Sequence, residues 1–574
     1  MTEFAEQLLK KHYCREGETV QEAFKRACDC FGSNPSHSKR LLNYINKEWF
    51  MFSSPILSNA IKYNELAKGL PISCFVTYVP DSIEGLCNHT TEVRWLSVKG
   101  GGVGGYWSDV RSISDKTPGA LSFLHTVDAD MVAYRQGKTR RGSYASYLNI
   151  DHPEIIEFIK MRVPSGDLNR KNLNLHHGVN ITDDFIDAVN NDLEWCLIDP
   201  HSLEVTDRLI ARELWEEIIL TRFRTGEPYI NYIDEANDKL HPALKAKGLR
   251  IHSSNLCNEI HLPTDSERTA VCCLSSVNLT TYDEWKDDEL FIGDLIEMLD
   301  NVLTFFINKA PKELVKAVTS AKGERSLGLG AMGFADYLQS KLIPFESSLA
   351  VSINRRMFKD IKTRALDKTQ QLARTRGEAL DALGYGIRNT HLLAIAPNAN
   401  SSIILGVSPS IEPRASNCYT HKTRVGSHLV KNIYLEKELQ SLGLDTPEIW
   451  NSILANNGSI QHLDIDDNLK KVFKTAYELN QEWVVIQAKA RSEYICQGQS
   501  VNLFFSAGAD KEYVNRVHRL AFIKGDDGFE PLKGLYYLRT ESSLKTEKVN
   551  VRVERNKLQD GVQGSLDTCI ACEG

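Results

Sequence analysis

The chain has 574 residues, of which 42% are hydrophobic and 25% are charged, as in ordinary globular proteins. Its 68 Lys and Arg against 75 Asp and Glu give a net charge of −7, which argues against nucleic acid as a partner. No apolar run reaches the ~18 residues of a membrane span, and the start, MTEFAEQLLKK, lacks the apolar core of a signal peptide. Thirteen Cys without an export signal indicate free thiols in a reducing cytosol.

The first fifty residues are predicted to form helices. Thr19 and Glu22 match a capping box, and the helix that they begin is expected to end near Gly32. From about residue 51, short β-rich runs alternate with amphipathic segments, which is typical of an α/β fold. The predicted strands are 72–79, 255–262, 270–279 and 391–396, and the predicted helices include 209–224, 290–309 and 349–374. From about residue 541 the chain is polar and is predicted to be a flexible tail.

Three residues in the run SNLCNEI are candidates for one site. Asn255, Cys257 and Glu259 are spaced two residues apart, so an extended segment would place an amide, a thiol and a carboxylate on one face. The alternative is a strand with a buried Cys and two solvated polar residues, since free Cys is commonly a small core residue.

Further cysteines suggest a relay of thiols. Cys74 lies in ISCFVTYV, and Cys272 and Cys273 are neighbours in AVCCLSSVNL, where a strand would turn them to opposite faces. Cys569 and Cys572 form a CIAC pair in the polar tail, with the spacing of a redox dithiol or of half a zinc site. An isolated Cys, two distant Cys and a terminal pair fit a three-stage relay that delivers two reducing equivalents per turnover.

Three runs raise the question of phosphate binding. GLGAMG at 328–333 matches GxGxxG, but AKGERS before it is not a strand, so we reject a dinucleotide fingerprint. KGGGVGG at 99–105 is compatible with an anion-binding turn and equally with a plain glycine turn. APNANSS at 396–402 follows an apolar strand, and both a phosphate cradle at a helix start and a plain turn fit its spacing.

Together these runs resemble the large, catalytic subunit of ribonucleotide reductase. Motifs that match that family in order are SCFVTYVPDSIEG, GGGVGGYWSDVR, TGEPYINYID, SNLCNEI, CCLSSVNL, RSLGLGAMGFADYL, NTHLLAIAPNANSS, SPSIEP, LYYLRT and the terminal CxxC. The resemblance implies a ten-stranded α/β barrel at 51–540 with Cys257 on a central finger loop. It also implies a short helical N-terminal segment at 1–50 and a disordered redox tail at 541–574.

The resemblance also implies the reaction, the reduction of ribonucleoside diphosphates to deoxyribonucleoside diphosphates. Cys257 would carry the thiyl radical that abstracts the 3′-hydrogen of the ribose. Glu259 would take the 3′-hydroxyl proton, which helps to expel the 2′-hydroxyl as water, and Asn255 would bind the ribose hydroxyls.

In the same resemblance, Cys74 and Cys272 would supply two electrons and close to a disulfide. Cys569 and Cys572 would reopen that disulfide by exchange and would be recharged by a thioredoxin- or glutaredoxin-like reductant.

Substrate and effector positions follow from the same matches. Those of the substrate pocket are Ser54, Ser73, Pro397, Asn398, Asn400, Ser401 and Ser402. The family often has Thr or Ser where this chain has Asn398 and Asn400. Asp81, Arg111 and the loop 134–146 match the allosteric site, where a deoxynucleoside triphosphate or ATP would bind at a homodimer interface and select the base that is reduced.

Tyr536 and Tyr537 bear on the class of the enzyme. Composition alone predicts two strand tyrosines, one buried and one exposed. In the resemblance, the pair marks class I enzymes, in which a separate small subunit (beta) generates the radical, so that no metal or cofactor is bound directly in this chain. The alternative is the adenosylcobalamin-dependent class II, which the glycine-rich run 100–105 and the terminal CxxC also resemble.

Only about fifty residues precede FSSPILSNA, so we expect no regulatory ATP cone. Such a short chain suits a viral or streamlined genome, and its location would be the bacterial cytosol or the cytosol of a host. Two hypotheses from other classes are a nicotinamide dehydrogenase, based on GLGAMG, and a non-catalytic zinc-binding protein, based on CIAC.

Overall fold

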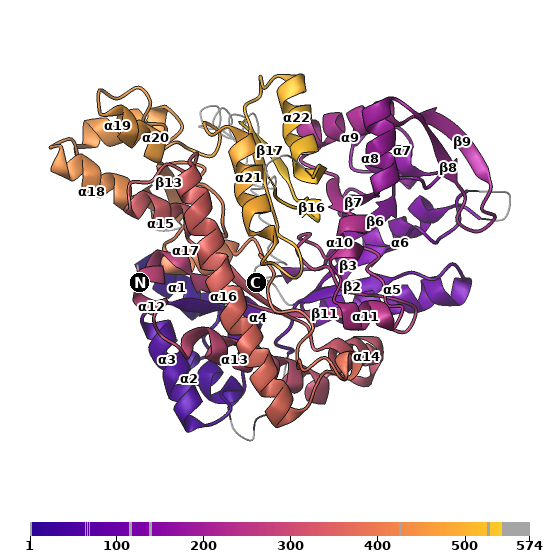
Figure 1. Ribbon diagram of the computed structural model, residues 1–574, viewed down its shortest axis with the longest axis horizontal. Coiled ribbons are helices and arrows are strands. Elements are labelled where there is room, and N and C mark those ends of the chain that lie inside the picture. The colour runs from indigo at the N-terminus through magenta and orange to yellow at the C-terminus, as the bar shows by residue number, and fades with distance from the viewer. Residues whose placement is uncertain are drawn as a thin grey trace.

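The computed structural model describes residues 3–62, 65, 67, 69–113, 117–136, 140–423, 426–524 and 528–541. Three helices begin the chain: α1 (Glu3–His12), α2 (Val20–Phe31) and α3 (Pro35–Asn46). The predicted capping box is confirmed, because Thr19 and Glu22 each accept a hydrogen bond from the other's backbone N–H, and α2 ends at Gly32. Helices α2 and α3 pack against α13 (Phe291–Lys309), as Figure 1 shows.

A nine-stranded sheet, counted over the described ranges, forms the centre of the molecule. Its order is β1-β11-β2-β3-β6-β7-β10-β16, and β12 pairs with β11. Strands β2, β3, β6, β7 and β10 are parallel to one another, and β11 runs antiparallel to β2. The bounds are β1 (Phe50–Phe52), β2 (Cys74–Tyr78), β3 (Gly102–Tyr106), β6 (Ser143–Asn149), β7 (His176–Ile181), β10 (Tyr229–Tyr232), β11 (Ala270–Asn278), β12 (Leu327–Met332) and β16 (Gly534–Leu535).

Isolated β-bridges and hydrogen bonds close the curled sheet into a barrel. Beyond β12, parallel bridges join Leu329 to Leu393 and Ile395 to Gln499. The Tyr536 N–H then donates to the Val501 carbonyl at 2.9 Å, next to β16. Strand β15 (Leu503–Phe505) pairs in parallel with β17 (Leu538–Thr540). The predicted barrel is therefore confirmed, although part of its wall consists of single bridges instead of regular strands.

Two predicted strands are wrong, and the glycine runs adopt unexpected structures. Residues 255–262 form a loop with a turn at 256–258, and 391–396 make only isolated bridges. Residues 102–105 of KGGGVGG lie in β3 and do not form a turn. GLGAMG is almost wholly strand β12, so the rejection of a dinucleotide fingerprint is confirmed.

Helices surround the barrel, and the predicted segments 209–224, 290–309 and 349–374 are confirmed as α9 (Ala211–Thr225), α13 and α16 (Ser348–Arg376). The other helices of eight or more residues are α5 (Ile83–Val98), α6 (Ala120–Ala133), α8 (Asp183–Asn191), α14 (Val315–Glu324), α18 (Ile433–Ser441), α19 (Pro447–Ala455), α21 (Gln481–Ser492) and α22 (Lys511–Phe522). Shorter helices include α4 (Ser54–Asn59), α7 (Ile155–Ile159), α15 (Phe334–Ser340), α17 (Ala399–Leu405) and α20 (Asp467–Val472). Within the described ranges, every helix is either too short or too polar for a membrane span.

A second, smaller core lies at one edge of the molecule, where α18, α19 and α20 project at the upper left of Figure 1. This core contains Trp450 together with Leu439, Ile453 and Phe473. The predicted redox tail, with Cys569 and Cys572, lies outside the described residues.

Candidate active site

The loop that carries Cys257 passes through the inside of the barrel. Tyr147 of β6 donates to the Asn255 carbonyl at 2.6 Å, and Asn258 donates to the carbonyl of Leu535 in β16 at 3.2 Å. From another part of the wall, the Ser500 hydroxyl donates to the Cys257 carbonyl at 2.6 Å. These bonds come from separate parts of the wall and hold the Cys257 side chain fully buried at a turn.

Gly104 explains why the wall next to this loop is rich in glycine. A Cβ on Gly104 would lie 2.7 Å from the Asn255 Cα and would overlap the Ser254 carbonyl oxygen. Real Cβ atoms essentially never approach backbone so closely, so any larger residue in this part of β3 would push the loop away. The glycine run therefore serves close packing.

We expect Gly104→Ala to lower the free energy of unfolding by at least about 2 kcal/mol, because an overpacked core must shift backbone. The matched control is Gly508→Ala, since a Cβ on Gly508 meets nothing within 4 Å. Chemical denaturation of both variants measures the difference. Equal unfolding midpoints for the two variants would contradict the packing role of Gly104.

The Asn255 side chain holds the backbone of the turn that carries Glu259. The Asn255 Oδ1 accepts hydrogen bonds from the backbone N–H of Glu259 at 3.0 Å and of Ile260 at 3.1 Å. In the described structure the buried Asn255 Nδ2 has no hydrogen-bond partner, and such a donor is costly unless a ligand or water satisfies it. Glu259 accepts from the Ser500 hydroxyl at 3.3 Å. The loop thus offers an amide donor and a carboxylate next to the thiol.

Cys74 and Cys272 face each other directly across β2 and β11, and both are buried free thiols. Opposite residues of antiparallel strands have Cβ atoms ~4.5–5.5 Å apart, near the ~3.5–4.5 Å of a disulfide. Both cysteines pack with Ile260 of the finger loop, whereas Cys273 lies in the main core. The prediction that Cys272 and Cys273 lie on opposite faces of one strand is therefore confirmed.

Burial raises the pKa of the Cys272 thiol well above its usual range, although Gln497 donates to its sulfur at 3.3 Å and opposes the shift. At neutral pH this thiol stays protonated. While it stays protonated, this thiol is a poor nucleophile, but together with the second thiol it can give two hydrogen atoms to an oxidant and form a disulfide.

Tyr536 and Tyr537 lie next to Cys257 despite their distance in sequence. The Tyr536 hydroxyl donates to the Cys257 Sγ at 3.3 Å, and the two tyrosine rings have centroids 4.3 Å apart. On the side away from Cys257, the Tyr537 hydroxyl oxygen lies 3.1 Å from the Nδ1 of His176. Tyr536 is 2% exposed and Tyr537 is half-buried.

The predicted phosphate loop leads directly into the helix α17, so the helix start expected for a phosphate cradle is present. The Asn398 side chain pins the loop, because it donates to the carbonyls of Ala331 and Ala396 and accepts from Ser276. Asn398 itself has a positive φ of 55°. Pro397, Asn400, Ser401 and Ser402 lie on the same loop or in the first turns of α17.

Ser54 and Ser73, predicted for the same pocket, lie on different elements. Ser54 begins α4, and its hydroxyl is 2.9 Å from that of Tyr13, which also accepts from the Asn400 side chain at 3.2 Å. Ser73 precedes β2, and its hydroxyl is 3.9 Å from the Cys74 sulfur. Tyr13 thus links Ser54 to the predicted phosphate loop.

The predicted effector residues contact each other. The Arg111 guanidinium lies 2.8 Å from the Asp81 carboxylate, and His201 is 3.7 Å from the same carboxylate. Of the predicted loop 134–146, residues 137–139 lie outside the described ranges.

Several residues at the site were not singled out from the sequence. Tyr229 packs on Tyr536 and Tyr537, with ring centroids 4.8 and 5.1 Å away. Gln497 and Ser500 contact the reactive loop and the cysteine pair. Tyr229 stood in the matched run TGEPYINYID, but no local pattern marked Gln497 or Ser500.

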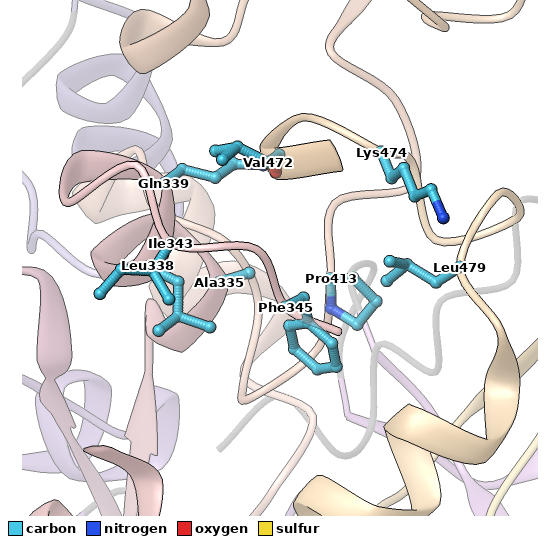
Figure 2. A pocket seen from close by; sticks show the side chains of 9 residues that line it. All are labelled: Ala335, Leu338, Gln339, Ile343, Phe345, Pro413, Val472, Lys474 and Leu479. Atoms are coloured by element: carbon cyan, nitrogen blue, oxygen red, sulfur yellow. Dashed lines mark hydrogen bonds between the residues drawn. The ribbon is translucent and has the colours of Figure 1, made fainter. Parts of the chain in front are cut away.

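A separate small cavity lies beside α15 and is shown in Figure 2. Its lining is mostly apolar, with Leu338, Ile343 and Phe345. Its two polar side chains already have partners, Gln339 the carbonyl of Val472, which also lines the cavity, and Lys474 the carboxylate of Glu346. Its volume of ≈ 10 Å³ holds about one water molecule. Of the predicted site residues within the described ranges, none lines it.

A buried cysteine on a loop inside an α/β barrel, with a facing pair of thiols packed against the same loop, defines a thiol-dependent oxidoreductase. The family model described as "Ribonucleotide reductase, barrel domain" matches residues 72–382 and 380–538. A putative ribonucleoside-diphosphate reductase large subunit of Frog virus 3 (isolate Goorha) is 54% identical over 100% of this chain and 99% of its own length. The chain therefore belongs to the ribonucleotide reductase family, as a large-subunit enzyme.

Two further relatives bear on the class. A solved class Id ribonucleotide reductase alpha subunit of Actinobacillus ureae has a TM-score of 0.83 and 35% identity, covering 94% of this chain and 97% of that one. A vitamin B12-dependent ribonucleoside-diphosphate reductase of Thermoplasma acidophilum is 30% identical over 89% of this chain and 67% of its own length.

Proposed function

We propose that this chain reduces ribonucleoside diphosphates to deoxyribonucleoside diphosphates by thiyl-radical chemistry, with the radical supplied by a separate small subunit. The observation that carries the proposal is the contact of 3.3 Å between the Tyr536 hydroxyl and the Cys257 sulfur, continued by the Tyr537 ring. The diphosphate substrate is supported by the name of the Frog virus 3 relative.

In this reaction, the Cys257 thiyl radical takes the 3′-hydrogen of the ribose and returns a hydrogen at the end. Glu259 takes the 3′-hydroxyl proton, as a positioned carboxylate can, and the buried Asn255 Nδ2 donates to the ribose hydroxyls. The position of both groups within one turn of the loop supports these roles.

The electrons come from the facing thiols. The C2′–O bond breaks, the 2′-hydroxyl leaves as water, and a C2′–H bond forms. Cys74 and Cys272 together lose two hydrogens and form one S–S bond, which balances the reduction. Their direct pairing across β2 and β11 supports this step.

The remaining parts of the proposal follow the family resemblance. Cys569 and Cys572 reopen the disulfide by exchange and pass the oxidation to a thioredoxin- or glutaredoxin-like protein. The loop 397–402, with Ser54 and Ser73, binds the substrate phosphates. Asp81 and Arg111 bind a deoxynucleoside triphosphate or ATP at the interface of a homodimer. The radical cofactor belongs to the small subunit.

The second candidate is an adenosylcobalamin-dependent reductase, which the Thermoplasma relative favours. Two observations support the class I proposal over it: the tyrosine pair in line with Cys257, and the higher identity and coverage of the Actinobacillus class Id alpha subunit.

Reconstitution separates the two candidates. We expect the purified chain to form dCDP from CDP only when its small subunit is added, with dithiothreitol as reductant. Adenosylcobalamin without the small subunit should give no product. Turnover with adenosylcobalamin alone would contradict class I, and absence of product under both conditions would contradict the reductase activity itself. CTP in place of CDP tests the diphosphate preference.

A further inference from the structure

A cysteine that the proposed reaction does not use lies against a lysine beside the barrel wall. Cys496 follows α21, and Lys362 belongs to α16, which packs against α21. The Lys362 Nζ is 2.6 Å from the Cys496 sulfur, and the backbone N–H of Leu392 donates to the same sulfur at 3.4 Å. A cation and a backbone donor thus meet on one sulfur, and both favour its negatively charged form.

These contacts make Cys496 a reactive type of cysteine. Burial by itself would raise the pKa of the thiol, but Lys362 and the backbone N–H groups of Leu392 and Leu393 outweigh burial and lower the pKa. The residue is half-buried, so part of it is open to solvent. Reactive cysteines lie in such electropositive, partly exposed places, whereas fully buried structural cysteines are inert.

Cys14 provides a comparison of similar exposure within the same chain. It is also a half-buried free thiol. There, burial and the charge of Glu18 raise the pKa of the thiol and outweigh the cations of Arg26 and Lys10. The two cysteines therefore differ in how readily they ionise, while their exposure is alike.

The segment that begins at Cys496 reaches two parts of the active site. Gln497 donates to the Cys272 sulfur at 3.3 Å, and the Ser500 hydroxyl donates to the Cys257 carbonyl at 2.6 Å. A change in the charge of Cys496 would therefore occur at the start of a segment that holds both the thiol pair and the reactive loop.

We propose that Cys496 is a site of S-oxidation, at which hydrogen peroxide converts the thiolate beside Lys362 to a sulfenic acid. The sulfur attacks one oxygen of the peroxide, so that the O–O bond breaks and an S–OH group forms. The other oxygen leaves as hydroxide and takes a proton from solvent to give water. The sulfur loses two electrons, which the peroxide gains. The sulfenic acid is neutral, so the ion pair with Lys362 is lost, and dithiothreitol restores the thiol with formation of its own disulfide and water.

The rate at which each cysteine is trapped as its sulfenic acid tests the proposal. The full chain is treated at neutral pH with hydrogen peroxide in the presence of dimedone, which reacts with sulfenic acids, and peptide mass spectrometry locates the adducts. We expect the adduct at Cys496 to form at least about tenfold faster than that at Cys14, because the pKa values of the two thiols are shifted in opposite directions. Equal rates at the two positions would overturn the inference. The assay needs neither substrate nor small subunit, so its outcome is independent of the reductase activity.

Lys362→Met removes the cation and keeps a side chain of similar length. We expect it to slow formation of the Cys496 adduct by at least about tenfold, whereas Lys362→Arg, which keeps the charge, should retain most of the rate. The matched control is Lys359→Met, since Lys359 is exposed on the same helix. Thermal melting checks the fold of each variant, and the comparison with Cys14 in the wild type decides if Lys362→Met does not fold. A folded Lys362→Met variant with the wild-type rate at Cys496 would overturn the proposal.

Discussion

Cys257→Ser is expected to reduce deoxynucleotide formation below detection while leaving the fold intact. Serine has nearly the same shape, but its O–H bond is too strong for a tyrosyl radical to break. The Tyr536 hydroxyl contacts the Cys257 sulfur and the site is fully buried, so a thiol from solvent cannot take the place of Cys257. The change in unfolding free energy should be about 1 kcal/mol, as for most substitutions. Product formation from CDP and a thermal melt measure the two quantities.

Cys273→Ser is the control for this experiment. Cys273 is also buried, but it lies in the main core on the opposite face of β11 from Cys272. Its replacement buries a hydroxyl and should cost about 1–3 kcal/mol of stability, with turnover per folded molecule retained. Measurable product from Cys257→Ser, or equal loss of turnover in both variants, would contradict the catalytic role of Cys257.

Tyr536→Phe and Tyr537→Phe are each expected to abolish turnover with the small subunit. Phenylalanine keeps the ring packing, with centroids 4.3 Å apart in the native pair, but it has no O–H bond to break. The electron would then have to cross the whole gap to Cys257 in one step. A purely structural role for the tyrosines predicts near-normal turnover and a loss of about 1 kcal/mol of stability each.

Tyr229→Phe is the matched control, because Tyr229 belongs to the same ring cluster, whereas the hydroxyl that donates to the Cys257 sulfur is that of Tyr536. We expect this variant to keep most of its turnover. An adenosylcobalamin-dependent enzyme would tolerate all three substitutions, because its radical arises beside the cysteine. Wild-type turnover of a well-folded Tyr536→Phe variant with the small subunit would contradict the relay and the class I proposal.

Local structure was predictable wherever the contacts that determine it lie within one helix or strand. The capping box at Thr19 and Glu22 is satisfied by contacts three residues apart, and the amphipathic periodicity of α9, α13 and α16 reflects one buried face each. The opposition of Cys272 and Cys273 follows from the two-residue period of any strand. The strand assigned to 255–262 failed because the same polar and apolar alternation occurs in a loop whose bonds come from β6, β16 and Ser500.

The order of many motifs along the chain was enough to identify the family, and those motifs contain the cysteines and tyrosines that carry the proposed chemistry. Which of these residues meet depends on the folded barrel. Tyr536 contacts Cys257 across 279 positions of the chain, and Cys74 faces Cys272 through strand pairing. The close approach of Gly104 to the finger loop and the contact of Glu227 with His176 also depend on the folded structure. Sequence patterns report periodicity within one element, whereas these contacts depend on how the barrel closes, which no single segment encodes.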